Sequence, residues 1–499
     1  MPATAASPTD SSSTLEAARD RRFFCLLLFV AVMDLWVLPL RSSFWLDETG
    51  TFWVIKDGFP ALWERCLHWA GQYPFYFLID WAAFAAGGRH EWVLRLPSLV
   101  ALVTAIGMFY RLAERLFDTA TAQFAVLVFV CSEQILFAAS DARPYALGLA
   151  MVIGSAWALV RWLDTGRGRF AVAHVVFTVA VVYVHYLFAL SLAVFGVYAL
   201  WRARGERYVA TGKLIAAWVA CGILVLPLVP PALRYYQNRA NHSFAVTPSL
   251  SDLLGAIAPP VLIGSIGVGL FAAWLIFPGH LRGRLAARKE NLLLAIGWAL
   301  AAPAILYAVA TLTPLKLFVP RYFMPSLPGL ALVAGWLVCS VVTSAGRRVV
   351  ATLLVVASVF TFGTLVHGHE DWAGAMRTIR SLPGSAGLPV LAASGFVEAR
   401  DPDAMDDPRW REVLFAPQIM YPPPGPLVRL PYTLGPAAEA YVERLLPQVE
   451  REKRFVLLVR FEGLRWEPWL RGRLAPEGFR SNTLGEFGTL GVFLFSREN

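Results

Sequence analysis

Eleven separate apolar runs dominate this 499-residue chain. A helix that crosses a membrane needs about 20 mostly apolar residues, with a range of roughly 17–25. The chain is 57% hydrophobic and 16% charged, whereas a soluble domain carries about 25% charged residues. The sequence therefore predicts an α-helical polytopic membrane protein with about eleven transmembrane helices. The expected spans lie near residues 22–40, 93–111, 120–138, 145–162, 170–184, 187–201, 213–231, 259–277, 291–312, 322–343 and 349–366.

The apolar stretch Tyr73–Ala86 is too short to cross easily, so we expect it, with residues 59–69, to lie at the membrane interface. The alternative is a short true span, which would invert the orientation of everything after it. Basic residues favour the interfacial assignment. With eleven spans, 18 Lys and Arg residues fall on the N-terminal side and ten in the opposite short loops. Because positive loops mark the cytoplasm, a multi-pass inner (plasma) membrane protein with its N-terminus cytoplasmic and its C-terminus periplasmic is expected.

The composition divides the chain into three parts. Residues 1–21 are expected to be a disordered cytoplasmic tail, and 22–366 a transmembrane domain that includes a first outer loop at 41–92. Residues 367–499 have shorter apolar runs and predict a small C-terminal extracytoplasmic α/β domain. Its expected strands lie at 388–394, 455–461 and 491–496, and its helix at 436–450.

Charge and cysteine content exclude several classes. The net charge of +9 follows from basic cytoplasmic loops, so no nucleic-acid partner is expected. Four of the five cysteines fall inside apolar runs, which leaves no recognisable disulfide framework or thiol metal site. Phosphate-binding and dinucleotide-binding glycine motifs are missing from the sequence.

Asp47 and Glu48 lie in the loop that follows the first apolar run. Carboxylates at a membrane edge are costly to desolvate, so this pair is a candidate catalytic site. Successive loop residues point in different directions, and we expect only one of the two to face a substrate. The alternative is that the pair caps the helix that follows, since acidic residues favour a helix's first turn.

Arg143, Arg321 and Lys316 lie at span ends on the same side as Asp47. A guanidinium offers two parallel donors that match a phosphate, which makes these residues candidates for substrate binding. The alternative is that they reach lipid headgroups or close a helix end. Asp141 is either the ion partner of Arg143 or a residue that positions the substrate.

His185 separates two predicted spans with almost no loop between them. It is either an interfacial histidine, a hydrogen-bonding contact to substrate, or a metal ligand. His367 and His369 could hold a metal only if a carboxylate such as Glu370 joined them. No cofactor is predicted with certainty, and a divalent metal stays open.

Six short motifs, in this order, resemble those of the GT-C glycosyltransferases, and most closely the branch that holds protein O-mannosyltransferases and lipid A aminoarabinose transferases. The resemblance covers roughly residues 20–380, and Tyr73, Tyr145 and Tyr322, which stand within it, are further candidates for substrate contact. The motifs are Leu46-Asp47-Glu48, Tyr73-Pro74-Phe75-Tyr76, Arg95-Leu96-Pro97-Ser98, Ala142-Arg143-Pro144-Tyr145, His185-Tyr186 and Pro320-Arg321-Tyr322-Phe323-Met324-Pro325.

The resemblance implies an inverting enzyme that moves a sugar from a polyprenyl-phosphate donor to a glycan, lipid or protein acceptor at the periplasmic face. Such a transfer needs a base for the acceptor hydroxyl and cations for the departing phosphate, roles that suit Asp47 and the arginines. The alternative function is a transporter or flippase of lipid-linked glycans. Transporters favour internal symmetry and helices broken in matching halves, and the sequence shows neither. A receptor or scaffold would leave the acidic loop unexplained.

Overall fold

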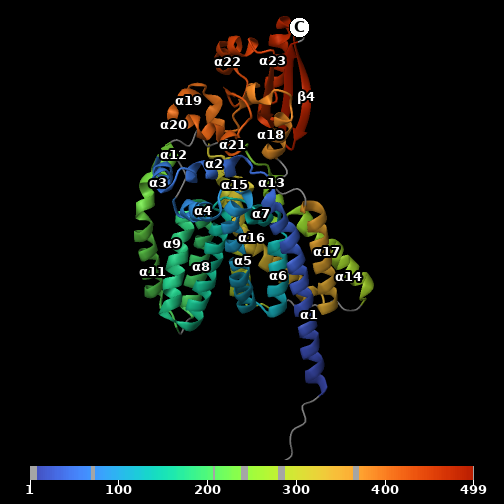
Figure 1. Ribbon diagram of the computed structural model, residues 1–499. Coiled ribbons are helices and arrows are strands. Elements are labelled where there is room, and N and C mark those ends of the chain that lie inside the picture. Colours follow the sequence, from blue (N-terminus) through green and yellow to red (C-terminus); the bar gives the residue numbers. More distant parts are fainter. Residues whose placement is uncertain are drawn as a thin grey trace, which may run out of the picture. The chain divides into compact units, whose positions relative to one another are not determined.

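The computed structural model describes residues 8–68, 74–205, 208–237, 246–278, 287–363 and 370–497. The chain forms two compact units, and each is assembled from separate stretches of sequence (Figure 1). Unit 1 comprises residues 1–40, 95–233 and 245–364. Unit 2 comprises residues 41–94, 234–244 and 365–499. The first outer loop and the C-terminal segment therefore belong to the same unit.

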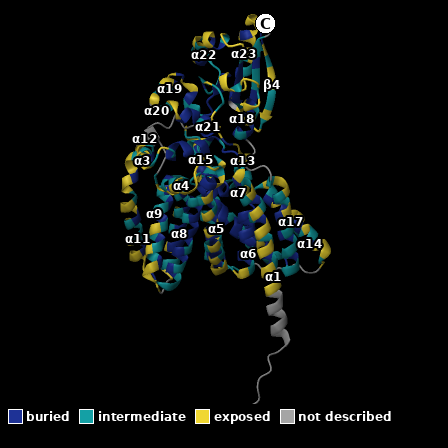
Figure 2. Ribbon diagram, in the orientation of Figure 1, coloured by how far each residue is buried: buried dark blue, intermediate teal, exposed yellow. Residues whose placement is uncertain are grey.

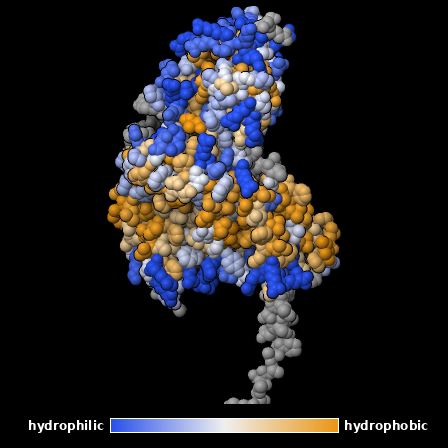
Figure 3. Space-filling model, in the orientation of Figure 1, coloured by the Kyte–Doolittle hydropathy of each residue, from blue (hydrophilic) through white to orange (hydrophobic). Residues whose placement is uncertain are grey.

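Unit 1 is built from long apolar helices. A broad band of hydrophobic side chains covers them, and it ends in hydrophilic residues (Figure 3). The helices that lie wholly or mainly in unit 1 are α1 (Pro8–Val32), α5 (Glu91–Leu116), α6 (Thr119–Val130), α7 (Glu133–Ala139), α8 (Tyr145–Thr165), α9 (Gly168–Val184), α10 (Leu190–Arg204), α11 (Thr211–Val225), α12 (Val229–Gln237), α13 (Leu250–Ile257), α14 (Pro260–Ile276), α15 (Lys289–Leu312), α16 (Leu327–Val341) and α17 (Ser344–Phe362).

Within the described residues, eight helices are long and apolar enough to cross a membrane, or ten if each of two bent pairs counts as one span. The bent pairs are α6 with α7, at 70°, and α13 with α14, at 52°. The one predicted span outside this count, 170–184, is α9, an apolar helix of 17 residues. The prediction of a polytopic helical membrane protein is confirmed. One boundary differs: α1 begins at Pro8, inside the stretch expected to be a disordered tail.

Close helix packing in unit 1 depends on small residues. A Cβ at Gly329 of α16 would lie 2.4 Å from the backbone nitrogen of Ala299 in α15, so only glycine permits this approach. The indole of Trp298 fills the space beside it and donates to the carbonyl of Pro325 at 2.6 Å. The burial pattern follows this packing, because α8 is mostly buried and α11 is largely exposed (Figure 2).

Unit 2 contains short helices and one mixed sheet of five strands in the order β2-β1-β3-β5-β4. β1 pairs in parallel with β2 and β3, and β5 pairs antiparallel with β3 and β4. The strands are β1 (Val390–Ala393), β2 (Leu427–Leu430), β3 (Arg454–Arg460), β4 (Phe479–Phe487) and β5 (Leu490–Arg497). The helices are α2 (Leu46–Ile55), α3 (Phe59–His68), α4 (Pro74–Gly87), α18 (Trp372–Arg380), α19 (Asp403–Asp406), α20 (Pro408–Arg411), α21 (Ala416–Met420), α22 (Pro436–Glu450) and α23 (Trp466–Leu474).

The core of the sheet is apolar. Val442 and Leu446 of α22 and Trp466 of α23 pack with the inward side chains of β3 and β5. The predicted α/β domain is confirmed, with the expected strands present as β1, β3 and β5 and the expected helix as α22. The sequence analysis missed β2 and β4. β2 is only four residues long, and β4 is a largely exposed strand without an apolar run.

Candidate active site

The acidic pair lies in the first turn of α2, after Trp45 in an extended conformation. Glu48 is fully buried, and its carboxylate accepts the backbone N–H of Trp45 at 3.1 Å. Such a contact satisfies a donor that a helix start leaves open. Asp47 is half-buried. The two carboxylates thus differ in the fold: Glu48 is buried and closes the start of the helix, whereas Asp47 is half-buried.

Asp47 has two acidic neighbours from the C-terminal segment, Glu370 and Glu398. Burial raises the pKa of the Glu370 carboxyl, and the negative charge of Asp47 raises it further. The positive charge of Arg460 lowers this pKa but does not cancel the rise. Burial also raises the pKa of Glu398, again with a contribution from Asp47. Like charges and desolvation both disfavour ionised carboxylates, so Glu370 and Glu398 bind protons more readily than exposed glutamates.

Glu370 is held by several contacts. Its Oε1 lies 3.0 Å from a guanidinium nitrogen of Arg460 on β3, and its Oε2 accepts the indole N–H of Trp372 at 2.9 Å. It also accepts the backbone N–H of Leu46. Arg460 donates further to the carbonyl of Gly395 at 3.3 Å. A buried carboxylate keeps its charge only with such partners.

The segment just before α2 has other long-range contacts. Ser43 donates to Asp371 at 2.8 Å, and the backbone N–H of Phe44 donates to the hydroxyl of Tyr421 at 2.8 Å. That hydroxyl donates in turn to Glu91 at 2.9 Å. The backbone that leads to Asp47 is therefore fixed by residues from distant parts of unit 2.

A second group of predicted residues comes together in unit 1, around His185. The rings of Tyr145 and Tyr322 lie 5.6 and 5.7 Å from its imidazole. Burial, followed by the positive charges of Arg143 and Arg321, lowers the pKa of His185 to about 3. Its Nδ1 is buried without a hydrogen-bond partner in the described part of the chain. This cluster joins a neutral histidine, two aromatic rings and two guanidinium groups.

The loop that carries Arg321 is fixed by packing. Phe323 is buried against Ala302 and Leu306 of α15, beside the start of α10. Because Arg321 and Tyr322 form a 3-10 turn directly before Phe323, this anchor holds both next to His185. The guanidinium of Arg321 lies 5.6 Å from the ring of Tyr322.

The other predicted binding residues differ in their surroundings. The ammonium group of Lys316 donates to the carbonyls of Ala310 and Thr313, at the end of α15. Lys316 therefore makes the contacts expected of a residue that closes a helix end, which was one alternative to substrate binding. Asp141 is fully buried in the segment that joins α7 to α8. Tyr73 lies outside the described residues, as do His367 and His369.

No group of three or more metal-binding side chains occurs among the residues that the structure describes. Glu370, the carboxylate that the sequence linked to a histidine metal site, is paired with Arg460. The five cysteines are free thiols.

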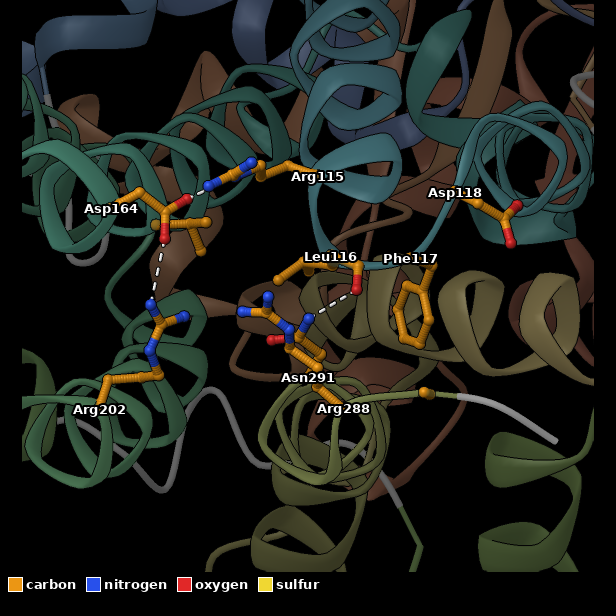
Figure 4. Close-up of a pocket in the computed structure, with 10 residues that line it drawn as sticks. Arg115, Leu116, Phe117, Asp118, Asp164, Arg202, Arg288 and Asn291 are labelled. Carbon is orange, nitrogen blue, oxygen red and sulfur yellow. Dashed lines mark hydrogen bonds and ion pairs between the residues drawn. The ribbon is translucent and has the colours of Figure 1, made fainter. Parts of the chain in front are cut away.

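A polar cavity of about 530 Å³ lies at the other end of unit 1 (Figure 4). Asp164 bridges two cations there, at 2.6 Å from Arg115 and 3.1 Å from Arg202. α8 runs from Tyr145 near His185 to this end over 21 residues, or about 30 Å. The carboxylate of Asp164 on α8 pairs with arginines near the ends of α5 and α10 and so joins three helices, which gives the cavity a structural explanation.

Sequence reasoning missed Glu370, Glu398 and Arg460 as neighbours of Asp47. Glu370 carried a weak signal, since it stands in a Glu-Asp-Trp triplet at the start of the C-terminal segment. Glu398 and Arg460 carried none, because only the folding of unit 2 places them near Asp47.

Comparison with known proteins supports this assignment of the fold. Residues 72–235 match the family described as dolichyl-phosphate-mannose-protein mannosyltransferase. None of the curated proteins compared with the chain matches it. Two structures of ArnT from Cupriavidus metallidurans are similar, each at 14% identity over 94% of this chain and 97% of that one. The TM-score is 0.51 for the apo state and 0.50 for the form bound to undecaprenyl phosphate. The resemblance seen in the sequence is confirmed: the chain has the fold of the GT-C glycosyltransferases, and its residues 72–235 carry the pattern of the dolichyl-phosphate-mannose-protein mannosyltransferase family.

Proposed function

We propose that this protein is an inverting glycosyltransferase that uses a polyprenyl-phosphate-linked sugar, with Asp47 as the general base. The observation that carries the proposal is the division of labour in the acidic pair. Glu48 closes the start of α2, whereas Asp47 is a half-buried carboxylate with Glu370 and Glu398 nearby. Proton acceptance from a hydroxyl is the role that such a group suits.

The reaction is a single displacement. The acceptor O–H gives its proton to Asp47, and the oxygen attacks the anomeric carbon of the sugar. The bond from that carbon to the phosphate oxygen breaks, and the polyprenyl phosphate leaves with the electron pair. Attack opposite to the leaving group inverts the configuration. Because the phosphate departs as a stabilised anion, no second carboxylate is needed as an acid.

The cluster around His185, within unit 1 itself, has the groups that suit a phosphate-binding site. Arg143 and Arg321 provide positive charge, and His185 stays neutral beside them. Guanidinium groups bind phosphate through paired donors. The similarity to ArnT, whose structure holds undecaprenyl phosphate, supports a polyprenyl phosphate as the carrier. We place the site on the periplasmic side of the inner membrane, with a glycan, lipid or protein as acceptor.

Transfer of a radiolabelled sugar from polyprenyl phosphate by the purified protein tests the proposal. Asp47→Asn keeps the shape of the side chain but cannot accept a proton, so turnover should fall by about 10²–10⁴. The exposed Asp403 of unit 2 provides the matched control, and Asp403→Asn should be as active as the unaltered protein. If the folded Asp47→Asn variant turned over substrate nearly as fast as the control, Asp47 would not be the general base. If the protein moved an intact lipid-linked sugar across the vesicle membrane without transferring the sugar to an acceptor, the result would favour a flippase.

A further inference from the structure

Asp47, the proposed base, follows a short segment, residues 43–46, that is held in place by residues far away in the sequence. Ser43 is bonded to Asp371, 328 positions later, and Phe44 to Tyr421, 377 positions later. Ser43 also accepts the backbone N–H of Ala373 at 3.2 Å. The C-terminal segment thus determines where the first turn of α2 lies.

Leu46, the residue before Asp47, is held on two sides. Its backbone N–H donates to the carboxylate of Glu370. Its side chain lies against Gly395, where a Cβ would come within 2.7 Å of Leu46 Cδ1. Arg460 connects both contacts, because it pairs with Glu370 at 3.0 Å and donates to the Gly395 carbonyl at 3.3 Å.

Resting on the proposed function, we propose that Glu370 is a positioning residue for the reaction: with Arg460, it holds Leu46, and so Asp47, in the orientation that proton transfer needs. A base must be placed closely against the proton it accepts, and a displacement of about 1 Å can cost roughly 10²-fold in rate. A buried ion pair fixes one geometry because neither charge has another place to go.

Glu370 also affects the site through its charge. The charged groups that face it are Asp47 on α2 and Arg460 on β3, and Glu398 faces Asp47 from the turn Val397–Arg400. Removing the negative charge of Glu370 makes proton uptake beside it less favourable. The acidic limb of the pH–activity profile should then move to lower pH, an effect that loss of stability alone would not produce.

Glu370→Gln is the direct test, because glutamine keeps an acceptor for Leu46 and Trp372 but loses the ion pair. We expect kcat to fall about 10- to 100-fold, KM for the lipid-linked donor to stay within about two-fold, and the acidic limb to shift as stated. Glu443→Gln is the matched control. It breaks another carboxylate–arginine pair of unit 2, that of Glu443 on α22 with Arg473 on α23 at 2.8 Å. It should leave kcat and the pH profile unchanged.

Arg460→Lys is a second variant that tests the same positioning role if Glu370→Gln does not fold. Lysine retains the charge beside Glu370 but not the second contact to Gly395, so we expect an intermediate loss of kcat. Folded protein of either variant with the kcat and pH profile of the control would overturn the positioning role. If Asp47→Asn were also fully active, the proposed function itself would fail. If Asp47→Asn alone were inactive, only the role of Glu370 would be lost.

Discussion

The hydroxyl of Ser43 donates to the carboxylate of Asp371 at 2.8 Å, across 328 positions of the chain. Asp371 also caps α18 by accepting the backbone N–H of Gly374 at 2.8 Å. One aspartate therefore fixes both the start of a C-terminal helix and the outer loop that leads to Asp47. Unit 2 is assembled from stretches that are distant in the sequence, so its stability and the geometry of the acidic loop are linked.

Replacement of Arg321 should weaken binding of the lipid-linked donor. Loss of a charge-assisted contact costs on the order of 1.5–3 kcal/mol, so Arg321→Ala should lower donor affinity by about ten-fold or more. Arg321→Lys should restore only part of it, because an ammonium lacks the paired donors. Titration of the purified protein with polyprenyl phosphate measures both. Unchanged affinity in both variants would remove Arg321 from the site.

Lys316 provides the matched control for Arg321, since it is a nearby cation that donates to the carbonyls at the end of α15. Lys316→Met should lower the free energy of unfolding by about 0.3–1 kcal/mol and leave donor affinity unchanged. A large loss of affinity in Lys316→Met would instead show that the ammonium group leaves the helix end to bind phosphate.

Glu48 should act on stability more than on chemistry. Glu48→Gln keeps an acceptor for the backbone N–H of Trp45, so turnover per folded molecule should stay within a few-fold of normal. Glu48→Ala removes that acceptor, and an unsatisfied buried donor costs about 1–3 kcal/mol. Thermal unfolding together with normalised turnover separates the two effects. A stable but inactive Glu48→Gln would give Glu48 a catalytic role.

Glu398 should make unit 2 less stable as the pH rises. Burial raises its pKa in the folded protein above the usual value of 4.5, so the folded state binds more protons than the unfolded state just above that pH. Stability that depends on the protonated carboxyl is therefore lost as the pH rises through the raised pKa. Glu398→Gln should match the unaltered protein near pH 4.5 and unfold at a higher temperature at pH 8.

The background of Asp47→Asn checks the cause of this pH dependence. The charge of Asp47 contributes to the raised pKa of Glu398, so the advantage of Glu398→Gln should shrink when Asp47 is neutral. An advantage of the same size in both backgrounds would mean that burial alone raises the pKa.

Membrane orientation can be tested with fusions after Asn499. The basic loops predict that the C-terminal segment lies outside the cytoplasm. A reporter that is active only in the periplasm should therefore work at this position, and a cytoplasmic reporter should not. The opposite pattern would mean that Tyr73–Ala86 crosses the membrane and inverts the rest of the chain.

The sequence by itself determined the membrane class, the positions of the spans and most of the C-terminal elements. These features depend on local properties: the length of an apolar run, or an alternation such as that of β3 and β5. The aromatic and basic motifs also indicated a site, and the structure brings Arg143, Tyr145, His185, Arg321 and Tyr322 together as a cluster.

Only the tertiary structure distinguishes the two carboxylates of the acidic pair. Asp47 and Glu48 are chemically alike and adjacent, but in the fold Glu48 is fully buried and accepts the backbone N–H of Trp45, whereas Asp47 is half-buried. The contacts of Lys316, Glu370 and Arg460 also come only from folding, since each has a partner that the sequence does not indicate. Such partners come from chain segments that burial forces together, and burial of the whole of unit 2 is not a local property.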